Sequence, residues 1–141
     1  MHDNVLLPID LQHPESWERA LPVAKRLAGD AGRIHLLAIV HDFGSSMVAT
    51  FLPKGYEQKV LQATKEGLDR FASQHFPDAD RVSIHVGHGH VAETILNAAR
   101  KYGADLIVMA SDKPDELRSI LVSRDANAVV RHSPVSVMVV R

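Results

Sequence analysis

Residues 105–110 read DLIVMA, residues 135–140 read VSVMVV, and between them residues 117–132 have the composition of a helix. A buried strand, a loop, a helix and a second buried strand form a βαβ unit, which is the building block of a parallel sheet. The loop that follows Ala110 leaves the carboxyl end of the first strand and leads into the helix. Open α/β sheets bind their ligands at such loops, so this loop is the first candidate for a binding site.

The same alternation of strand and helix extends back to the start of the chain. Strand-like runs occupy residues 4–10, 33–40 and 81–86. Segments with helical periodicity cover residues 17–28, 56–76 and 91–102. The first two runs are continuously apolar, as in strands buried on both faces, whereas the third alternates like an edge strand. We therefore predict one domain over residues 1–141, a doubly wound α/β fold with helices on both faces of a parallel sheet.

Two prolines lie inside these predicted elements. Pro8 has no N–H to donate to a ladder, so the first strand is expected to end there, with Asp10 at its carboxyl tip. Pro22 falls inside the first helical segment, and we expect it to kink that helix or to mark a bend that faces solvent. Residues 41–55 are rich in polar and small residues and predict a long loop.

The composition limits the class of protein. The chain has 141 residues, no cysteine and a formal net charge of −1, with charges of both signs interspersed. We therefore expect no disulfide framework, no thiolate metal site, and no surface for nucleic acid or membranes. No apolar run approaches the roughly 20 residues of a membrane span, and no N-terminal stretch resembles a signal peptide, so the expected location is the cytoplasm.

Four stretches carry a resemblance to a known family: VLLPID at residues 5–10, Gly89 before the third predicted helix, GADLIVMAS at 103–111 and VVRHSPVSVMVVR at 129–141. Over nearly its whole length the chain resembles the universal stress proteins, and ASDKPD at residues 110–115 is most similar to their small single-domain F/G-type branch. The resemblance implies a Rossmann-like sheet of five parallel strands in the order 3-2-1-4-5. It also implies homodimers in which the last strand, within residues 135–140, pairs antiparallel with its copy across a two-fold axis.

ATP-binding members of that family carry a phosphate motif after the fourth strand: Gly, two residues, Gly, nine residues, Gly, then Ser or Thr. Glycines let backbone N–H groups approach phosphate oxygens, and the helix that follows favours negative charge. The matching positions here are Ala110, Lys113, Ser123 and Arg124, so the spacing is kept and each residue of the motif is changed. Either triphosphate binding is weak or lost, or Lys113 and Arg124 replace the backbone donors with charge.

The adenosine end of the implied site is better preserved. The family positions that hold the base and ribose are matched by Pro8, Ile9, Asp10 and Val40. AMP, ATP or another adenosine compound is therefore a candidate ligand, accompanied by Mg²⁺ if it is a triphosphate. The residues that the resemblance places at the nucleotide crevice are Pro8, Ile9, Asp10, Val40, Met109, Ala110, Ser111, Asp112, Lys113, Ser123, Arg124, Asp125 and Ala126.

An enzyme is the competing interpretation. Asp10 and Asp112 could hold Mg²⁺ at adjacent strand ends in a nucleotide-handling hydrolase or transferase. Asp115 and Asp125 also lie near the motif, and carboxylates repel phosphates unless a metal bridges them. The sequence contains no recognisable set of nucleophile, base and orienting residue, so no catalytic residue is assigned. The predicted function is a stress-response regulatory module that binds an adenine nucleotide weakly or acts through a protein partner.

Residues 85–92 contain two further motifs with simpler explanations. His85, His88 and His90 have a spacing that can bind zinc or nickel, but separate surface histidines explain them as well, and no metal site is predicted. Residues 87–92, GHGHVA, fit the dinucleotide fingerprint G-x-G-x-x-A between a strand and a helix. The strand before them alternates like an edge strand, whereas the fingerprint belongs at a central switch point, so we expect a plain turn here.

Overall fold

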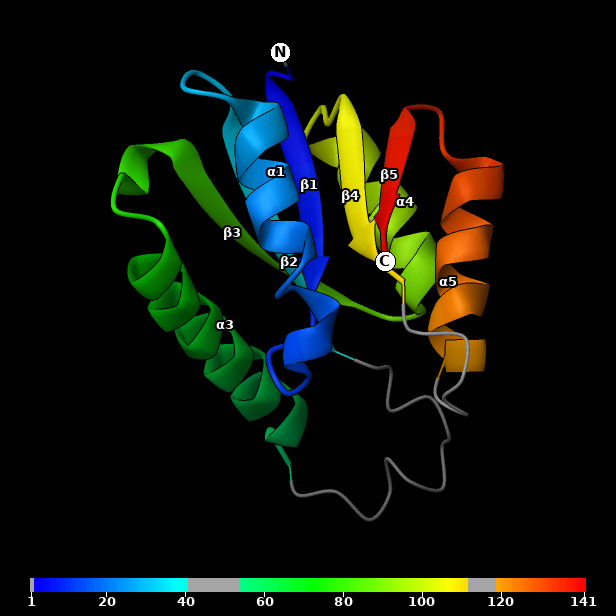
Figure 1. The fold of residues 1–141 in the computed structure, drawn as a ribbon. Helices are drawn as coiled ribbons and strands as arrows, with labels where there is room; N and C mark the ends of the chain where they lie inside the picture. The colour runs from blue at the N-terminus through cyan, green and yellow to red at the C-terminus, as the bar shows by residue number, and fades with distance from the viewer. Residues whose placement is uncertain (1, 41–53, 112–118) are drawn as a thin grey trace.

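The sheet has five strands in the order β3-β2-β1-β4-β5 (Figure 1). The computed structural model describes residues 2–40, 54–111 and 119–141. The strands are β1 Asn4–Ile9, β2 Arg33–Val40, β3 Val82–His88, β4 Leu106–Ala110 and β5 Ser136–Val140. All neighbouring strands are parallel, so the predicted doubly wound sheet and its strand order are confirmed.

Helices cover both faces of this sheet. In the described part of the chain they are α1 Ala20–Ala28, α3 Tyr56–His75, α4 Val91–Lys101 and α5 Ser119–His132, with short 3-10 helices η1 Pro14–Ser16 and η2 Ala79–Arg81. The helices α1 and α3 pack on one face, and α4 and α5 pack on the other (Figure 1). The reversal of winding between the two pairs places β1 and β4 side by side at the centre.

One hydrophobic core lies between the sheet and the pair α1 and α3. Side chains of a strand alternate between faces, so every second residue of β1 and β4 points into this core. Its members include Val5, Leu7 and Ile9 of β1, Leu106 and Val108 of β4, Ala20, Ala24 and Ala28 of α1, and Leu68, Phe71 and Ala72 of α3. Three alanines on α1 let that helix lie close to the sheet, whereas α3 reaches it with larger side chains.

The second core lies under α4 and α5. Its members include Leu6, Leu37, Ile107 and Met109 of the sheet, Ile95, Ala98 and Ala99 of α4, and Ala126 and Val129 of α5. The consecutive residues Val5, Leu6 and Leu7 are each 0% exposed, because one of them faces this core and two face the other. The central strand is therefore buried on both faces, as its continuous apolar run predicts.

The expectation that Pro8 ends the first strand was wrong. β1 continues through Pro8 to Ile9 and stays paired with β2 over that whole length, so Pro8 does not end the strand. α1 begins at Ala20, which puts Pro22 in its first turn. Pro22 is exposed there, and the N–H of the preceding Leu21 donates to the carbonyl of Trp17 at 2.8 Å.

Arg81 joins the start of β3 to the turn between α1 and β2. Its Nη2 donates to the carbonyl of Gly32 at 2.9 Å and also contacts the carbonyl of Gly29. Gly32 lies where two backbone segments meet: a Cβ there would be 2.2 Å from the carbonyl oxygen of His2 and 2.4 Å from that of Ala28. Such a close approach of main chains is compatible only with glycine.

The predicted loop at residues 41–55 falls mostly outside the described residues, which resume at Lys54. Of the helices that the structure describes, none has the length and apolar character needed to cross a membrane.

Leu68 anchors α3 to the sheet, and its truncation should destabilise the fold. Leu68 is 0% exposed, so Leu68→Ala leaves a cavity and should lower the free energy of unfolding by about 2–5 kcal/mol. Urea denaturation followed by far-UV circular dichroism measures this change. Leu61→Ala is the matched control on the same helix, because Leu61 is partly exposed and should lose less than half as much. Equal losses would contradict the packing described for α3.

The two glycines that bracket the turn after α1 should respond differently to an added methyl group. Gly29 has φ +67° and ψ −156° and open space around a built Cβ, so Gly29→Ala costs backbone strain alone, about 1–3 kcal/mol. Gly32→Ala must displace two backbone carbonyls and should cost about 3 kcal/mol or more. Thermal and urea unfolding of the two variants measures the difference, and a milder effect at Gly32 would show that the main chains are not in close contact.

Candidate functional site

β1 and β4 stop pairing before their carboxyl ends. Their parallel register comprises Val5↔Leu106 and Leu6↔Ile107. β1 nevertheless stays paired with β2 up to its last residue, and β4 stays paired with β5 up to its last residue. The hydrogen-bond ladder between the two central strands therefore stops short of their carboxyl ends. This place is the topological switch point, where open α/β sheets bind ligands. We define the candidate site as the carboxyl ends of β1 and β4 with the residues that follow each.

Pro8 explains why this ladder ends. The carbonyl of Asn4 accepts a hydrogen bond from the backbone N–H of Asp105 at 2.9 Å, so the peptide groups of Asn4 face β4. Peptide groups point alternately to the two neighbouring strands, and the nitrogen of Pro8 therefore also faces β4. Proline has no N–H, so β1 lacks a donor at the position where its next bond to β4 would form.

Asp10 occupies the exposed end of β1, as predicted. The N–H of Gln12 donates to its Oδ1 at 3.0 Å, and Nδ1 of His13 lies 2.8 Å from its Oδ2. The N–H of Asp10 donates to Oγ of Ser16 at 2.8 Å, and the Ser16 hydroxyl donates back to the Asp10 carbonyl at 3.0 Å. These bonds hold the carboxylate in place while 55% of the side chain stays exposed.

His13 and Ser16 were not singled out from the sequence. Their signal is local: polar side chains three and six positions after a strand-end aspartate can close a turn around it. The Ser16 hydroxyl donates to a backbone carbonyl, and His13 contacts the carboxylate of Asp10. The three residues therefore form a closed turn, and their bonds differ from those of a Ser-His-Asp relay, in which the histidine contacts the serine.

The β4 side of the candidate site is formed by Ala110 and Ser111, which are both partly exposed. The N–H of Ser111 donates to the carbonyl of Val140 at 2.7 Å, so the chain still pairs with β5 one residue beyond β4. This backbone donor is consequently committed to the sheet. Asp125, near the middle of α5, is partly exposed.

Several predicted site residues are core residues in the structure. Ile9 is 5% exposed and packs under α1 and α3, whereas Met109 and Ala126 are similarly buried under α4 and α5. Val40 is buried at the end of β2, where its carbonyl accepts from the N–H of Gly89. The structure thus brings four predicted residues to the partly exposed, adjoining ends of β1 and β4: Pro8, Asp10, Ala110 and Ser111.

The structure describes fewer of the predicted phosphate-binding residues. Asp112 and Lys113 lie outside the described residues. Ser123 and Arg124 lie within α5, but their side chains are also outside the described set.

His85 and His88 lie on β3 and His90 precedes α4, and the two on the strand contact different side chains. Nε2 of His85, which is partly exposed on β3, lies 2.9 Å from Nδ1 of His35. Nε2 of His88 lies 3.2 Å from Oε1 of Glu57, and His90 is exposed at the N-cap of α4. Over residues 2–40, 54–111 and 119–141, no group of three or more His, Cys, Asp or Glu side chains could hold a metal ion.

The glycine fingerprint before α4 serves packing. β3 is the edge strand of the sheet, so residues 87–92 lie away from the switch point. A Cβ on Gly87 would lie 2.4 Å from Cγ2 of Thr94 and 3.5 Å from Cδ1 of Leu37. The space that a ligand-binding glycine would leave open is therefore filled by side chains of α4 and β2.

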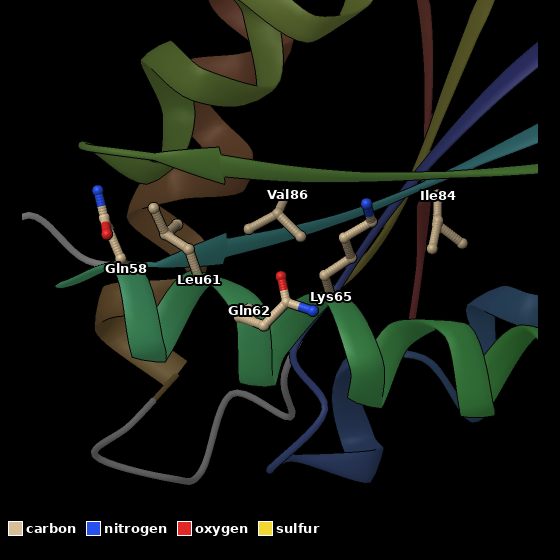
Figure 2. A pocket seen from close by; sticks show the side chains of 6 residues that line it. All are labelled: Gln58, Leu61, Gln62, Lys65, Ile84 and Val86. Carbon is tan, nitrogen blue, oxygen red and sulfur yellow. The ribbon is translucent and has the colours of Figure 1, made fainter. Parts of the chain in front are cut away.

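A groove lies at a different place, along the free edge of the sheet between α3 and β3 (Figure 2). Its lining residues are Ile84 and Val86 of β3 and Gln58, Leu61, Gln62 and Lys65 of α3. The helical residues have the spacing i, i+3, i+4 and i+7, which predicts one helix face from the sequence. The strand residues of the groove, Ile84 and Val86, could not be predicted in the same way, because helical periodicity does not show which strand packs against that helix face.

The family model of the universal stress proteins matches residues 1–141. The chain is 29% identical to universal stress protein G of Escherichia coli O157:H7 and 27% identical to that of Salmonella typhimurium, in both cases over 143 residues and 100% of each chain.

Solved structures of the same family share this fold. Universal stress protein UspA from Lactobacillus plantarum matches with a TM-score of 0.69 at 21% identity, covering 99% of this chain and 97% of that one. A universal stress protein in complex with cAMP matches with a TM-score of 0.64 at 16% identity, with the same two coverages. Because the family model matches from the first residue to the last, this chain belongs to the universal stress protein family.

Proposed function

We propose that this chain is a stress-response binding module that takes an adenosine compound at the carboxyl ends of β1 and β4 and recognises a triphosphate weakly or not at all. One observation carries the proposal: β1 and β4 stop pairing after Leu6 and Ile107, and the Asp10 carboxylate is fixed beside that opening of the ladder. A carboxylate accepts hydrogen bonds and has lone pairs to spare beyond its two contacts here, so it suits the hydroxyl groups of a ribose.

A structural relative supports this class of ligand. That universal stress protein was solved in complex with cAMP, which has an adenine base, a ribose and one phosphate. An adenosine compound with few phosphates is therefore the ligand class that we favour for this chain.

The altered phosphate motif supports weak recognition of a triphosphate. Ala110 stands where the first motif glycine would be, and no non-glycine residue in the described ranges has a positive φ. The N–H of the next residue, Ser111, already donates to Val140, so it is not available to a phosphate oxygen. The alternative is that Lys113 and Arg124 bind the phosphates through charge, without a backbone cradle.

Calorimetric and thermal-shift titrations with AMP, cAMP, ADP and ATP, with and without Mg²⁺, test the proposed ligand class. AMP or cAMP at about 100 times its Kd should stabilise the protein by about 2.7 kcal/mol, and ATP should bind no more tightly than AMP. Asp10→Asn should weaken binding by about tenfold to a hundredfold, because it removes a charged acceptor. Asp69→Asn, on an exposed position of α3, is the matched control and should leave binding unchanged.

Three results would replace this account by another. Tighter binding of ATP that is lost in Arg124→Ala would establish the charge-based alternative. Turnover of Mg²⁺-ATP that is lost in Asp10→Asn would establish an enzyme. Absence of binding by every nucleotide, in protein freed of co-purified ligand, would leave a module that acts through a protein partner.

We also propose that the protein forms a homodimer through β5. This strand is at the edge of the sheet, and Met138 on it is 42% exposed. The carbonyl of Val140 accepts from Ser111 next to β4, so the peptide groups of Val137 and Val139 point outward. Outward N–H and C=O groups on an apolar edge strand favour pairing with an identical strand.

Val139→Pro should dissociate this dimer without breaking the sheet. Proline removes an outward N–H, while the β4–β5 ladder uses the alternate residues. Sedimentation velocity should show a dimer for the native chain, a monomer for Val139→Pro, and a dimer for the control Val139→Thr, which keeps both the N–H and the branched side chain. A Val139→Pro protein that stays dimeric would place the interface elsewhere, and a monomeric native chain would refute the dimer.

A further inference from the structure

Two histidines on neighbouring strands contact each other, away from the candidate site and toward the amino end of the sheet. Nδ1 of His35 on β2 lies 2.9 Å from Nε2 of His85 on β3, and we call these residues the histidine pair. Nε2 of His35 lies 3.0 Å from the side-chain oxygen of Asn4, the first residue of β1. The ring of Tyr102, just beyond α4, stacks on His85 with centroids 3.6 Å apart. His35 is 7% exposed.

The hydrogen bonds fix which ring nitrogens carry protons at neutral pH. The side-chain oxygen of Asn4 only accepts, so Nε2 of His35 must carry a hydrogen. Nδ1 of a neutral His35 is then an acceptor, and Nε2 of His85 must be the donor to it. Both neutral rings are therefore Nε2–H tautomers. Nδ1 of His85 is the one ring nitrogen of the pair that takes no part in these two hydrogen bonds.

This arrangement accommodates one extra proton but not two. The first can bind to Nδ1 of His85 and leave both hydrogen bonds intact. The second would have to bind to Nδ1 of His35. Two N–H donors would then face each other at 2.9 Å, and two cationic rings would be in contact.

The charged groups that act on the pair oppose protonation. Burial, followed by the charges of His35 and Lys101, lowers the pKa of His85 to about 4. Burial, followed by the charge of Arg33, lowers the pKa of His35. Lys101 extends from the end of α4 over the ring of Tyr102, with its Nζ 5.5 Å from the centroid.

Asp105 is a carboxylate at this end of the sheet, and it contacts other groups than the histidine pair. Oδ2 of Asp105 accepts from the N–H of Asp3 at 2.9 Å, and Oδ1 of Asp105 lies 3.4 Å from both the backbone nitrogen of Asn4 and Nδ1 of His2. This carboxylate is therefore bonded to the N-terminal segment and the start of β1, and the charges outside the pair that lower its two pKa values are Arg33 and Lys101.

We propose that the histidine pair is an acid-sensitive contact that holds Tyr102 and the end of α4 against β2 and β3 at neutral pH, and that protonation of both rings releases them. The contact spans three elements, because His35 and His85 join β2 to β3 and Tyr102 attaches α4 to both rings. The larger core residues Val91, Ile95 and Leu96 lie before the last turn of α4, whereas the buried residues nearest its end are Ala98 and Ala99, which are small. Loss of the aromatic stack should therefore loosen this end of α4 before the rest of the fold.

The sign of the pH dependence follows from proton linkage. The folded-state pKa of His85 lies below its unfolded value of 6.5, so the unfolded state binds protons first. Stability is therefore complete above pH 6.5 and falls as the pH drops toward 4. His35 acts in the same direction. Because the pair is partly screened by solvent, we expect the unfolding equilibrium constant to rise about tenfold between pH 7.5 and pH 5.

Nuclear magnetic resonance of the native chain tests the arrangement directly. At pH 7.5 the ring ¹⁵N shifts of His35 and His85 should both report the Nε2–H tautomer, and both rings should titrate below pH 6.5. Ordinary titration of either ring near pH 6.5, or an Nδ1–H tautomer for His35, would overturn the proposal. This measurement depends on no variant.

Hydrogen exchange tests the release of α4. After correction for intrinsic rates, amides near the end of α4 should lose protection between pH 6.5 and pH 4.5 before those of β1. His85→Gln can still donate to His35 but removes one of the two titrating rings, so it should reduce this pH dependence and the tenfold change in unfolding. His90→Gln, on an exposed histidine eleven positions before Lys101, should leave both unchanged. A uniform loss of protection, or equal pH dependence in His85→Gln, would contradict the proposal.

Discussion

The central constraint of the structure is that β1 is buried on both faces but lacks one backbone donor. Its side chains alternate between two cores, and each core is closed by a different pair of helices. The strand must pair with β2 and β4 to satisfy its peptide groups, because water cannot reach them. Pro8 removes the donor that would continue the ladder to β4, and the pairing of these two strands ends two residues earlier. A candidate binding site thus arises at the centre of the sheet without interrupting either core.

The two ends of the sheet have different chemistry. At the carboxyl ends, Asp10 presents an exposed carboxylate held by a closed turn. Toward the amino ends, Asn4, His35 and His85 satisfy one another in a chain of hydrogen bonds. The first arrangement leaves acceptor capacity for a ligand. The second has one correct distribution of hydrogens, so it is sensitive to a change in proton number.

Much of the fold could be predicted from the sequence because its signals are local or periodic. The continuous runs that became β1, β2 and β4, and the alternating run that became β3, each depend on neighbours a few positions away. The position of Asp10 at a strand tip follows from the same pattern. The strand order came from the family resemblance, since right-handed crossovers alone leave several orders open.

What the sequence did not reveal depends on contacts between distant residues. Pro8 looked like the end of a strand. Its missing N–H affects only the ladder to β4, however, and β1 stays paired with β2 through Ile9. The contact between His85 and His35 could not be foreseen, because these residues lie fifty positions apart and alternation does not predict which side chain an edge residue meets. Ile9, Met109 and Ala126 matched site positions of the family, but their side chains fill the cores beneath the site. Motif matching assigns a position and does not assign an orientation.

The position of β1 also bears on the order in which the fold can form. The carboxylate of Asp105 binds the N–H of Asp3, 102 positions earlier, and β4 supplies the second neighbour of β1. A growing chain can assemble β1, β2 and β3 with α1 and α3 while Leu6 and Leu37 still lack the residues of β4 and α5 that cover them. During synthesis one half of the molecule therefore exposes an apolar surface that only the later half can bury, which is the condition under which nascent chains depend on chaperones.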